Sequence, residues 1–169
     1  EDPSVLKIGH NIKYDALVMQ GHAIAIGPID DTMLISFALD AGSHGHGMDE
    51  LSELHLEHKT ITYDEVTGTG KTRLSFAEVA LDKALAYAAE DADVTWRLHR
   101  ALKPRLIQDR VTTVYETMDR PLVPVLAEME TAGIKVDPDA LRRLSLEFGQ
   151  TMETLASEIH GLEIGRAHV

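Results

Sequence analysis

Three carboxylates, Glu90, Asp91 and Asp93, lie close together in the segment AYAAEDADVTWRLHR. The segment is typical of a helix, in which successive residues are rotated by about 100°. On that helix Glu90 and Asp93 fall on a charged face, where Asp93 and Arg97 have the spacing of a surface ion pair. We therefore expect Glu90 and Asp93 to be solvated charges without a chemical role.

Asp91 falls on a different side of the same helix, in an apolar stripe. The other residues of the stripe are Ala80, Ala84, Tyr87, Val94 and Leu98. Burying a lone carboxylate costs on the order of several kcal/mol unless it is paired, hydrogen-bonded or bound to a metal ion. Tyr87 lies one turn earlier, so its hydroxyl and the carboxylate can reach a common point. The pattern leaves two alternatives open: a functional carboxylate, or a structural one held by a helix cap or a salt bridge, with Tyr87 as a core aromatic.

A second acid, Asp15, has a similar setting in an earlier segment. The residues NIKYDALVMQGH predict a helix with Asn11 near its N-cap, and Asp15 shares a face of that helix with Ile12 and Met19. Carboxylates that converge from separate helices bind hard cations such as Mg²⁺ or Mn²⁺. Asp15 and Asp91 are therefore candidates for one metal site.

The elements that would position these acids alternate between strands and helices. The runs SVLKIGHN and AIAIGPIDDT predict strands. Helices are predicted for the segment ending at Gly21, for TMLISFALDA, for MDELSELHLEHK, and from Ser75 to about Gln108. The stretch TITYDEVTGTGKTR predicts a loop or hairpin, and the alternation as a whole indicates an α/β fold.

The segments that follow have a different texture. YETMDRPLVPVLAEME predicts a helix bent around Pro121 and Pro124, AGIKVD predicts a turn and a short strand, and Pro138 starts a long amphipathic helix. We therefore expect a domain boundary between Pro104 and Val111.

Composition limits the class of protein. The chain has no cysteine, which excludes disulfides and thiolate metal sites and suits a reducing compartment. It has no apolar run near the roughly 18 residues of a membrane span and no signal peptide pattern, so we expect a cytoplasmic protein with no membrane partner. We also expect a monomer. Of the net charge of −12, −10 lies in residues 1–99, which argues against a broad phosphate-binding surface and is explained most simply by solubility. Because the chain opens on Glu1 rather than Met, we expect a piece of a longer protein.

Two of these segments resemble motifs of family A DNA polymerases, the family of bacterial DNA polymerase I. IGHNIKYD resembles the second exonuclease motif, Asn-x-x-x-Asp, here Asn11 to Asp15, and YAAEDADVT resembles the third, Tyr-x-x-x-Asp, here Tyr87 to Asp91. DTMLISFALDA, HGMDELSELHLEHKTITYDEVTGTGK and RPLVPVLAEMETAGIKVD are similar to the same family. The resemblance covers nearly the whole chain.

The resemblance implies a fold and a reaction. Residues 1–108 would be the C-terminal part of a 3′-5′ exonuclease domain with a ribonuclease H-like fold whose early strands are missing, and 109–162 the mainly helical beginning of a DNA polymerase domain. The reaction would be two-metal hydrolysis of DNA at a single-stranded 3′ end of a primer-template, with two divalent metal ions, Mg²⁺ or Mn²⁺, and Zn²⁺ as an alternative. The ending EIGRAHV, residues 163–169, departs from the family and resembles a translated sequencing adapter, so it is left out of the expected fold.

The same resemblance gives roles to individual residues. Asp91 would be a direct ligand of the first metal ion, Asp15 would hold the second largely through water, and the Tyr87 hydroxyl would orient the attacking water.

Three further residues would contact the DNA strand by the same resemblance. Asn11 and Tyr14 lie where the family contacts the single-stranded 3′ end, and Tyr63 occupies the place of an aromatic residue that stacks on a frayed base. The pattern around Tyr63 fits a surface tyrosine of a strand equally well.

One departure from the family bears on activity. Its first motif, Asp-x-Glu, should lie upstream of Glu1, so we expect these 169 residues alone to hydrolyse DNA poorly or not at all. The polymerase acids should lie beyond the last residue, which excludes nucleotidyl transfer by this piece. The alternatives are a ribonuclease D-type RNA exonuclease, against which RPLVPVLAEMETAGIKVD argues, and a non-catalytic scaffold domain, against which the presence of Asp15, Tyr87 and Asp91 argues.

Two other patterns carry less weight. GTGKT lacks the glycine that a phosphate-binding loop needs five positions before Gly70, where Glu65 stands. The histidines that could suggest zinc are His44, His46, His55 and His58. Because no cysteine accompanies them, we expect solvent-exposed histidines with adventitious metal affinity.

Overall fold

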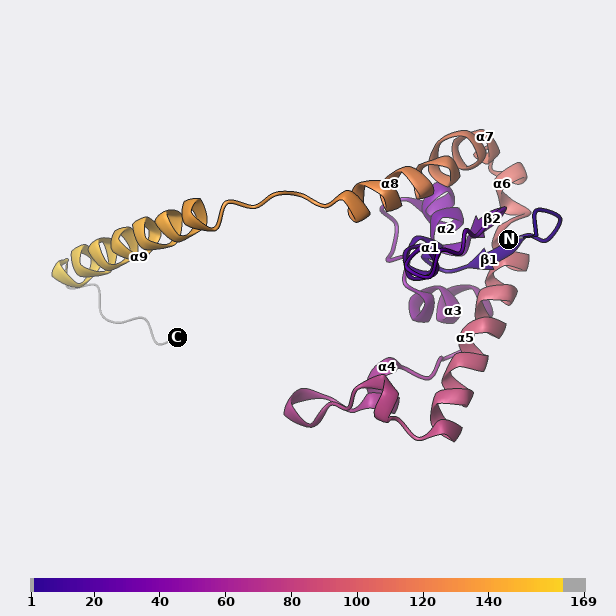
Figure 1. Ribbon diagram of the computed structural model, residues 1–169, viewed down its shortest axis with the longest axis horizontal. Helices are drawn as coiled ribbons and strands as arrows, with labels where there is room; N and C mark the ends of the chain where they lie inside the picture. Colours follow the sequence, from indigo (N-terminus) through magenta and orange to yellow (C-terminus); the bar gives the residue numbers. More distant parts are fainter. Residues whose placement is uncertain (1, 163–169) are drawn as a thin grey trace. The chain divides into compact units, whose positions relative to one another are not determined.

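The computed structural model describes residues 2–162 and divides the chain into two compact units, Glu1–Ala132 and Gly133–Val169 (Figure 1). Within the described residues no helix is long and apolar enough to cross a membrane. The expectation of an adapter-derived ending falls on residues 163–169, which lie outside the described part.

The first unit is built on two short parallel strands. Strand β1 (Lys7–Gly9) pairs with β2 (Ile29–Asp31), so that Lys7 lies opposite Ile29. Parallel strands need a crossover connection, and helix α1 (Ile12–Gln20) provides it. The helix has Asn11 at its N-cap position and ends at Gly21 as predicted, and the mixed α/β class is confirmed.

A buried carboxylate at the end of β2 sets the start of two helices. The backbone N–H groups of Asn11 and Ile12 donate to the Asp31 carboxylate at 3.0 and 2.9 Å, and those of Met33 and Leu34 donate to it at 2.9 and 3.4 Å. Asp31 therefore caps α1 as well as α2 (Thr32–Asp40). Asn11 has a left-handed backbone with φ 57° and its side chain makes no capping bond, so the capping atom of α1 comes from the neighbouring strand.

The hydrophobic core lies along the long helix α5 (Leu81–Leu102), where α2 and neighbouring helices pack on it (Figure 1). Its fully buried members are Ile35, Leu51, Val94, Leu98, Leu102, Leu106 and Tyr115. They come from α2, α3 (Met48–Leu56), α5, α6 (Arg105–Gln108) and the π-helical turn Tyr115–Asp119. The helix predicted from Ser75 is thus interrupted, since a 3₁₀ turn covers Phe76–Glu78 before α5 begins.

A second buried acid, Asp30, joins α5 to the strands. Its carboxylate lies 2.8 Å from His99 Nε2 and accepts hydrogen bonds from Lys103 Nζ at 3.0 Å and the Tyr115 hydroxyl at 2.9 Å. Burial would raise the pKa of Asp30, but the hydrogen bonds from His99, Lys103 and Tyr115 outweigh it and hold the pKa well below its ordinary value. Asp30 is therefore a charged tie between β2 and the C-terminal half of α5.

The stretch TITYDEVTGTGKTR is not the loop or hairpin that we predicted. It contains α4 (Tyr63–Thr67) and a 3₁₀ turn at Gly70–Thr72, and α4 packs on α5. A capping box starts α4, in which the Glu65 N–H donates to the Thr62 hydroxyl at 3.3 Å and the Thr62 N–H donates to the Glu65 carboxylate at 2.7 Å. The β-branched residues before Tyr63 favour an extended chain and Thr62 is extended, but its cap starts a helix at Tyr63.

The first unit extends beyond the boundary that we expected near residue 108. After α7 (Thr112–Val114) and the π turn, α8 (Arg120–Ala132) contains Pro124 and packs against α1. Lys13 of α1 forms an ion pair with Glu130 of α8. Compactness therefore places α8 with the strands.

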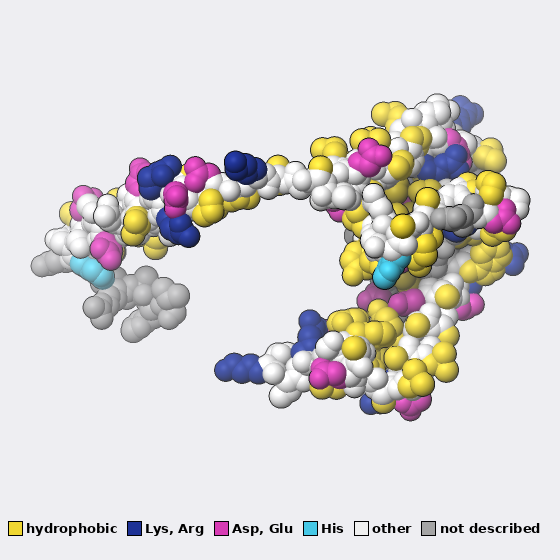
Figure 2. Space-filling model, in the orientation of Figure 1, with side chains coloured by type: hydrophobic (Ala, Val, Ile, Leu, Met, Phe, Trp, Pro, Cys, Tyr) yellow, Lys and Arg dark blue, Asp and Glu magenta, His cyan; other side chains and the backbone are white. Residues whose placement is uncertain are grey.

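Up to residue 162, where the described part ends, the second unit contains one long helix, α9 (Pro138–Gly161), which begins at Pro138 as predicted. The Asp137 carboxylate accepts hydrogen bonds from the N–H groups of Asp139 and Ala140 at 2.9 and 3.1 Å. The short strand predicted for AGIKVD is wrong, because no partner strand pairs with these residues in the described chain. Hydrophobic and charged side chains lie side by side on the visible face of α9 (Figure 2), and none of its residues is buried.

The Asp30 network gives a stability prediction. Asp30→Ala should lower the free energy of unfolding by about 2–4 kcal/mol, because His99 and Lys103 lose their buried partner. The loss is limited because the Lys103 ammonium keeps some access to water. Urea unfolding followed by circular dichroism measures the loss. Since the pKa of Asp30 is lowered in the folded state, its contribution is complete above pH of about 4 and is lost in stronger acid. The control Asp93→Ala should change stability by no more than about 0.5 kcal/mol, and an equal loss in both variants would contradict the role of Asp30.

Candidate active site

Asp15 of α1 and Asp91 of α5 line the same hollow, which has a volume of about 490 Å³. The remaining lining residues are Lys7, Ile8, Gly9, His10, Ile12, Met19, Ile26, Met48, Ala92, Thr95 and Trp96. The two acids come from helices that are far apart in the sequence, and both helices contact β1. The structure thus brings the two predicted carboxylates to one cavity.

The helical wheel predicted the position of Asp91 well and that of Asp15 less well. Val94 and Leu98 are fully buried beside the half-buried Asp91, whereas Ala80 is exposed and precedes the helix. In α1 only Ile12 is buried. Asp15 is exposed, although it lines the hollow. The predicted inward face is therefore correct for the C-terminal part of α5 and wrong for most of α1.

Within the described part of the chain neither carboxylate of the hollow is in an ion pair. Lys7 also lines the hollow, and its Nζ donates to the Gly27 carbonyl oxygen at 2.6 Å. Burial raises the pKa of Asp91, a hydrogen bond from Tyr87 opposes the rise, and the charges of Asp49 and Glu90 add to it. The pKa of Asp15 is also raised, because the walls of the hollow shield part of this otherwise exposed residue from water, and the negative charge of Asp31 adds to the rise. A hydrogen bond from the backbone of Asp15 itself opposes it. Both acids would gain from a bound cation, which would favour their charged forms.

Tyr87 lies one turn before Asp91 and shares its environment. Burial, followed by the negative charge of Asp91, raises the pKa of Tyr87 to about 12. The hydroxyl therefore stays protonated at neutral pH. It can donate a hydrogen bond to the carboxylate or to a water molecule beside it.

An aromatic cluster surrounds the Tyr87 ring. The Tyr63 ring stacks on Phe76 with centroids 6.0 Å apart, and both rings meet Tyr87 edge-on at 6.2 and 5.9 Å. The Arg73 guanidinium lies 5.7 Å from the centroid of Tyr63. Tyr63 is 44% exposed and starts α4, so it is not the strand residue that the pattern also allowed.

The other two predicted DNA contacts lie at the start of α1. Tyr14 is 67% exposed, and Asn11 is exposed as well. The Asp31 carboxylate accepts the backbone N–H of Asn11, which fixes the backbone and leaves the side-chain amide outside the helix cap.

The structure corrects the expectation for Glu90 and confirms it for Asp93. Glu90 is half-buried, and its carboxylate accepts the Ile61 N–H at 2.5 Å and lies 2.8 Å from His58 Nε2. It therefore ties the segment before α4 to α5, a role that no local pattern indicates. Asp93 is exposed and pairs with Arg97 at 3.5 Å.

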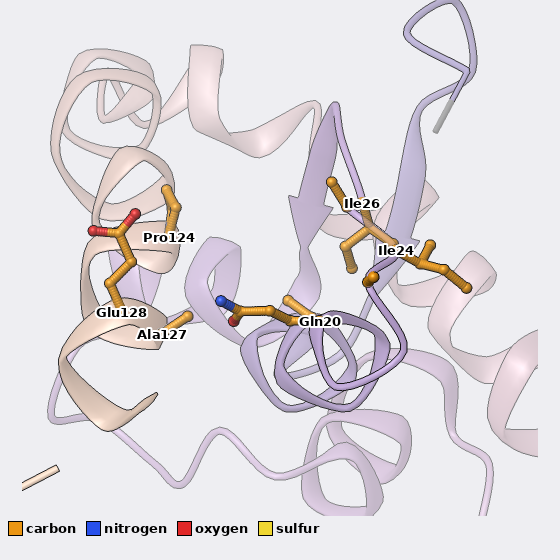
Figure 3. Close-up of a pocket in the computed structure, with 9 residues that line it drawn as sticks. Gln20, Ile24, Ile26, Pro124, Ala127 and Glu128 are labelled. Atoms are coloured by element: carbon orange, nitrogen blue, oxygen red, sulfur yellow. The ribbon is translucent and has the colours of Figure 1, made fainter. Parts of the chain in front are cut away.

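The carboxylate pair fits a divalent metal ion by its chemistry. Carboxylate oxygens are the ligands that Mg²⁺ and Mn²⁺ prefer, and the two acids line one cavity without forming an ion pair among the described residues. A second hollow of about 310 Å³ between the end of α1 and α8 lacks such a pair, since Glu128 is its one acidic residue and apolar side chains such as Ile24, Ile26 and Pro124 line it (Figure 3). The first hollow is therefore the candidate active site.

Comparisons with known proteins show what the chain is similar to. A family model described as 3′-5′ exonuclease matches residues 1–107. The chain is 52% identical over 162 residues to DNA polymerase I of Rhizobium leguminosarum and 40% identical over 166 residues to DNA polymerase I of Pseudomonas aeruginosa. Each match covers 96% of this chain but only 16% and 18% of those relatives. The solved structure of Brucella melitensis NrnC matches with a TM-score of 0.66 and 25% identity, covering 79% of this chain and 62% of that one.

The setting of Asp91 gives a test between the functional and the structural alternative. In metal-free buffer at pH 7, Asp91→Asn should leave the free energy of unfolding unchanged or raise it, by up to about 0.5 kcal/mol. The sign follows because the pKa of Asp91 is raised in the folded state, so the carboxylate destabilises the fold as pH rises through that pKa. Thermal unfolding measures the effect, with Asp93→Asn as the exposed control. A clear loss of stability in Asp91→Asn would identify a structural carboxylate.

Proposed function

Because the chain belongs to the 3′-5′ exonuclease family of family A DNA polymerases, we propose that it supplies the proofreading site of a DNA polymerase I, which removes the 3′-terminal nucleotide of a primer strand. The fold is the ribonuclease H-like fold expected from the sequence. The observation that carries the proposal is the meeting of Asp15 and Asp91 at one hollow without a paired cation.

Asp91, Asp15 and Tyr87 would have different roles in hydrolysis. Asp91 would hold the first metal ion directly, and Asp15 would hold the second largely through water. The family generally uses divalent metal ions, and such ions lower the pKa of a bound water and stabilise the leaving oxygen; Mg²⁺ or Mn²⁺ suits these oxygen ligands, with Zn²⁺ as an alternative. The protonated Tyr87 hydroxyl would hydrogen-bond the attacking water and fix its direction.

The DNA strand would reach the hollow along aromatic and polar side chains. An aromatic face such as that of Tyr63 stacks on any base, worth about 1–3 kcal/mol per base, and Arg73 beside it can meet a phosphate. Asn11 and Tyr14 would contact the single-stranded 3′ end from the other helix. Recognition by stacking suits an editing site, which must accept whichever nucleotide was misincorporated.

The rest of the chain fits the same protein. We propose that residues 1–108 are the C-terminal part of the exonuclease domain and 109–162 the beginning of the polymerase domain, within a DNA-directed DNA polymerase that acts as a cytoplasmic monomer in replication and repair. With these bounds α8 would belong to the polymerase part, and it packs on α1 within the compact unit that ends at Ala132. A ribonuclease D-type exonuclease is the second candidate, and the likeness to NrnC favours it. The higher identity to DNA polymerase I, which extends over α8, favours the first.

The role of Asp91 is testable in the whole polymerase that contains this chain. Asp91→Ala should lower 3′-5′ hydrolysis of a labelled single strand by at least about 100-fold, more than the loss of a group that only orients a metal ligand, and leave primer extension near normal. Asp93→Ala, two residues away on the exposed face, serves as the matched control and should keep both activities. Equal loss of hydrolysis and extension in Asp91→Ala would mean that the carboxylate is structural.

The 169-residue chain alone should be a poor nuclease. It contains no Asp-x-Glu sequence, so the carboxylates that complete the family's metal site are absent from it. We expect no mononucleotide release when the chain is incubated with a labelled single strand and Mg²⁺, under conditions in which the whole polymerase degrades the strand. Release by the chain, abolished in Asp91→Ala, would show that two carboxylates suffice.

A further inference from the structure

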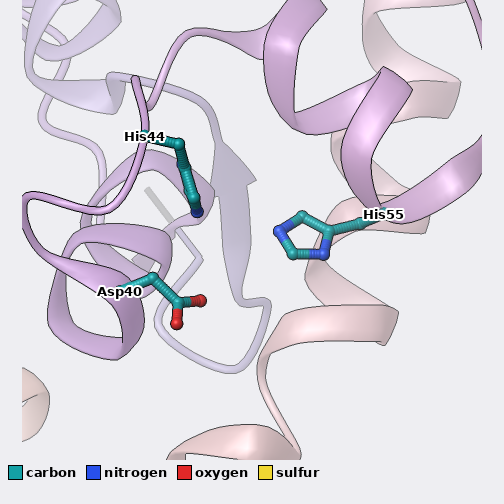
Figure 4. Close-up of side chains that lie close together, drawn as sticks. All are labelled: Asp40, His44 and His55. Atoms are coloured by element: carbon teal, nitrogen blue, oxygen red, sulfur yellow. The ribbon is translucent and has the colours of Figure 1, made fainter.

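A second cluster of ligand side chains lies apart from the hollow of Asp15 and Asp91. Asp40, His44 and His55 each offer one ligand atom, and these atoms all lie within 4.8 Å of one another. Figure 4 shows the three side chains pointing toward a common space. Asp40 is the last residue of α2, His44 lies in the loop that follows, and His55 is in the last turn of α3.

Two nitrogens of the cluster lack a partner. The Nε2 atoms of His44 and His55 are buried and make no hydrogen bond within the described residues. A buried polar atom without a partner costs about 1–3 kcal/mol, and such atoms in native proteins call for an explanation such as an ion. A metal ion between the rings would satisfy both nitrogens at once.

The other nitrogen of His44 fixes the tautomer that metal binding needs. Nδ1 lies 2.6 Å from the backbone carbonyl oxygen of Gly45, which can only accept a hydrogen bond. Nδ1 therefore carries the proton and Nε2 keeps a free lone pair. Metal-binding histidines commonly have this arrangement, in which a backbone carbonyl holds one ring nitrogen and the metal binds the other.

The carboxylate of Asp40 is oriented by a basic neighbour. Arg105 Nη2 donates to Asp40 at 3.1 Å and lies 3.4 Å from Asp109. A ligating carboxylate usually has such an outer hydrogen bond. The positive charge of Arg105 opposes a cation, and its sharing with Asp109 reduces that opposition.

The neighbouring histidines have partners of their own. His46 Nδ1 lies 2.9 Å from the Ser36 hydroxyl, and His58 Nε2 lies 2.8 Å from Glu90. The four histidines that suggest zinc in the sequence thus do not form one set of ligands, although the His46 ring lies 5.0 Å from that of His44. The expectation of solvent-exposed histidines is wrong for His44 and His55, whose Nε2 atoms are buried, and the third ligand is an aspartate that the histidine pattern does not indicate.

We propose that Asp40, His44 and His55 bind a zinc ion that fastens the loop between α2 and α3. Two imidazole nitrogens and one carboxylate oxygen suit Zn²⁺ better than Mg²⁺ or Ca²⁺, and the fourth tetrahedral position is left for water. Because the ligands come from two helices and their connection, zinc should stabilise the folded chain by an amount that grows with the logarithm of its affinity. The site is separate from the proposed nuclease site, whose ligands are carboxylates.

Zinc binding is measured on the complete chain without a histidine tag, by competition with a chromophoric zinc chelator in excess Mg²⁺. We expect one tightly bound equivalent of zinc per chain, and His44→Ala and His55→Ala should each lower the zinc affinity at least about 10-fold. The matched controls are His22→Ala and His160→Ala, two histidines exposed on other parts of the chain. Asp91→Asn should leave the tight equivalent unchanged, which separates this site from the nuclease site.

Bound Co²⁺ gives an independent readout. A site with two imidazoles and one carboxylate should give the visible absorption of four-coordinate Co²⁺, and His55→Ala should abolish it while the far-ultraviolet circular dichroism is retained. A variant that loses its helical signal is replaced by His44→Gln or His55→Gln. Equal weakening by His22→Ala, loss of the tight equivalent in Asp91→Asn, or no tight equivalent at all overturns the proposal.

Discussion

Two adjacent carboxylates at the end of β2 hold the rest of the first unit in place. Asp30 and Asp31 are each 1% exposed, and their oxygens face different elements. Asp31 accepts the first N–H groups of α1 and α2, while Asp30 accepts from His99, Lys103 and Tyr115. The helices that carry the candidate active-site acids, α1 and α5, are therefore both tied to one strand of three residues. A buried carboxylate is tolerable only when its hydrogen-bonding capacity is filled, and both meet that condition.

The aspartate in the hollow, Asp91, has a pKa shifted in the opposite direction from that of Asp30. Asp30 has a lowered pKa because its donors outweigh its burial, whereas Asp91 has a raised pKa because burial and the charges of Asp49 and Glu90 outweigh the Tyr87 hydroxyl. The contrast separates an acid that stabilises the fold from one that is left in need of a cation. Carboxylates with raised pKa values are common at sites that bind ions, and they lower the stability of the fold when no ion is bound.

Local patterns predicted much of the fold and only part of the site. The start of α9 at Pro138 follows from its cap and periodicity, which act within a few residues. The bounds of α1 were predicted correctly, although Asp31 rather than the Asn11 side chain caps the helix. The helical wheel also separated Asp91 from Asp93. Partners of Asp30 lie 69 to 90 residues away, so no local signal could indicate them, although Asp31 before a helical run is a recognisable N-cap. Glu90 was missed for the same reason, since its partner His58 lies 32 residues away. In the proposed zinc site, His44 and His55 were part of the histidine pattern, whereas Asp40 was not.

The central claim is that Asp15 and Asp91 together bind divalent metal ions in the hollow between α1 and α5. An anomalous difference map from crystals of the whole polymerase grown with Mn²⁺ tests it most directly. The account predicts a manganese peak bonded to a carboxylate oxygen of Asp91, with a second ion or its water shell reaching Asp15. Manganese bound elsewhere, with Asp91 facing bulk water, would contradict it.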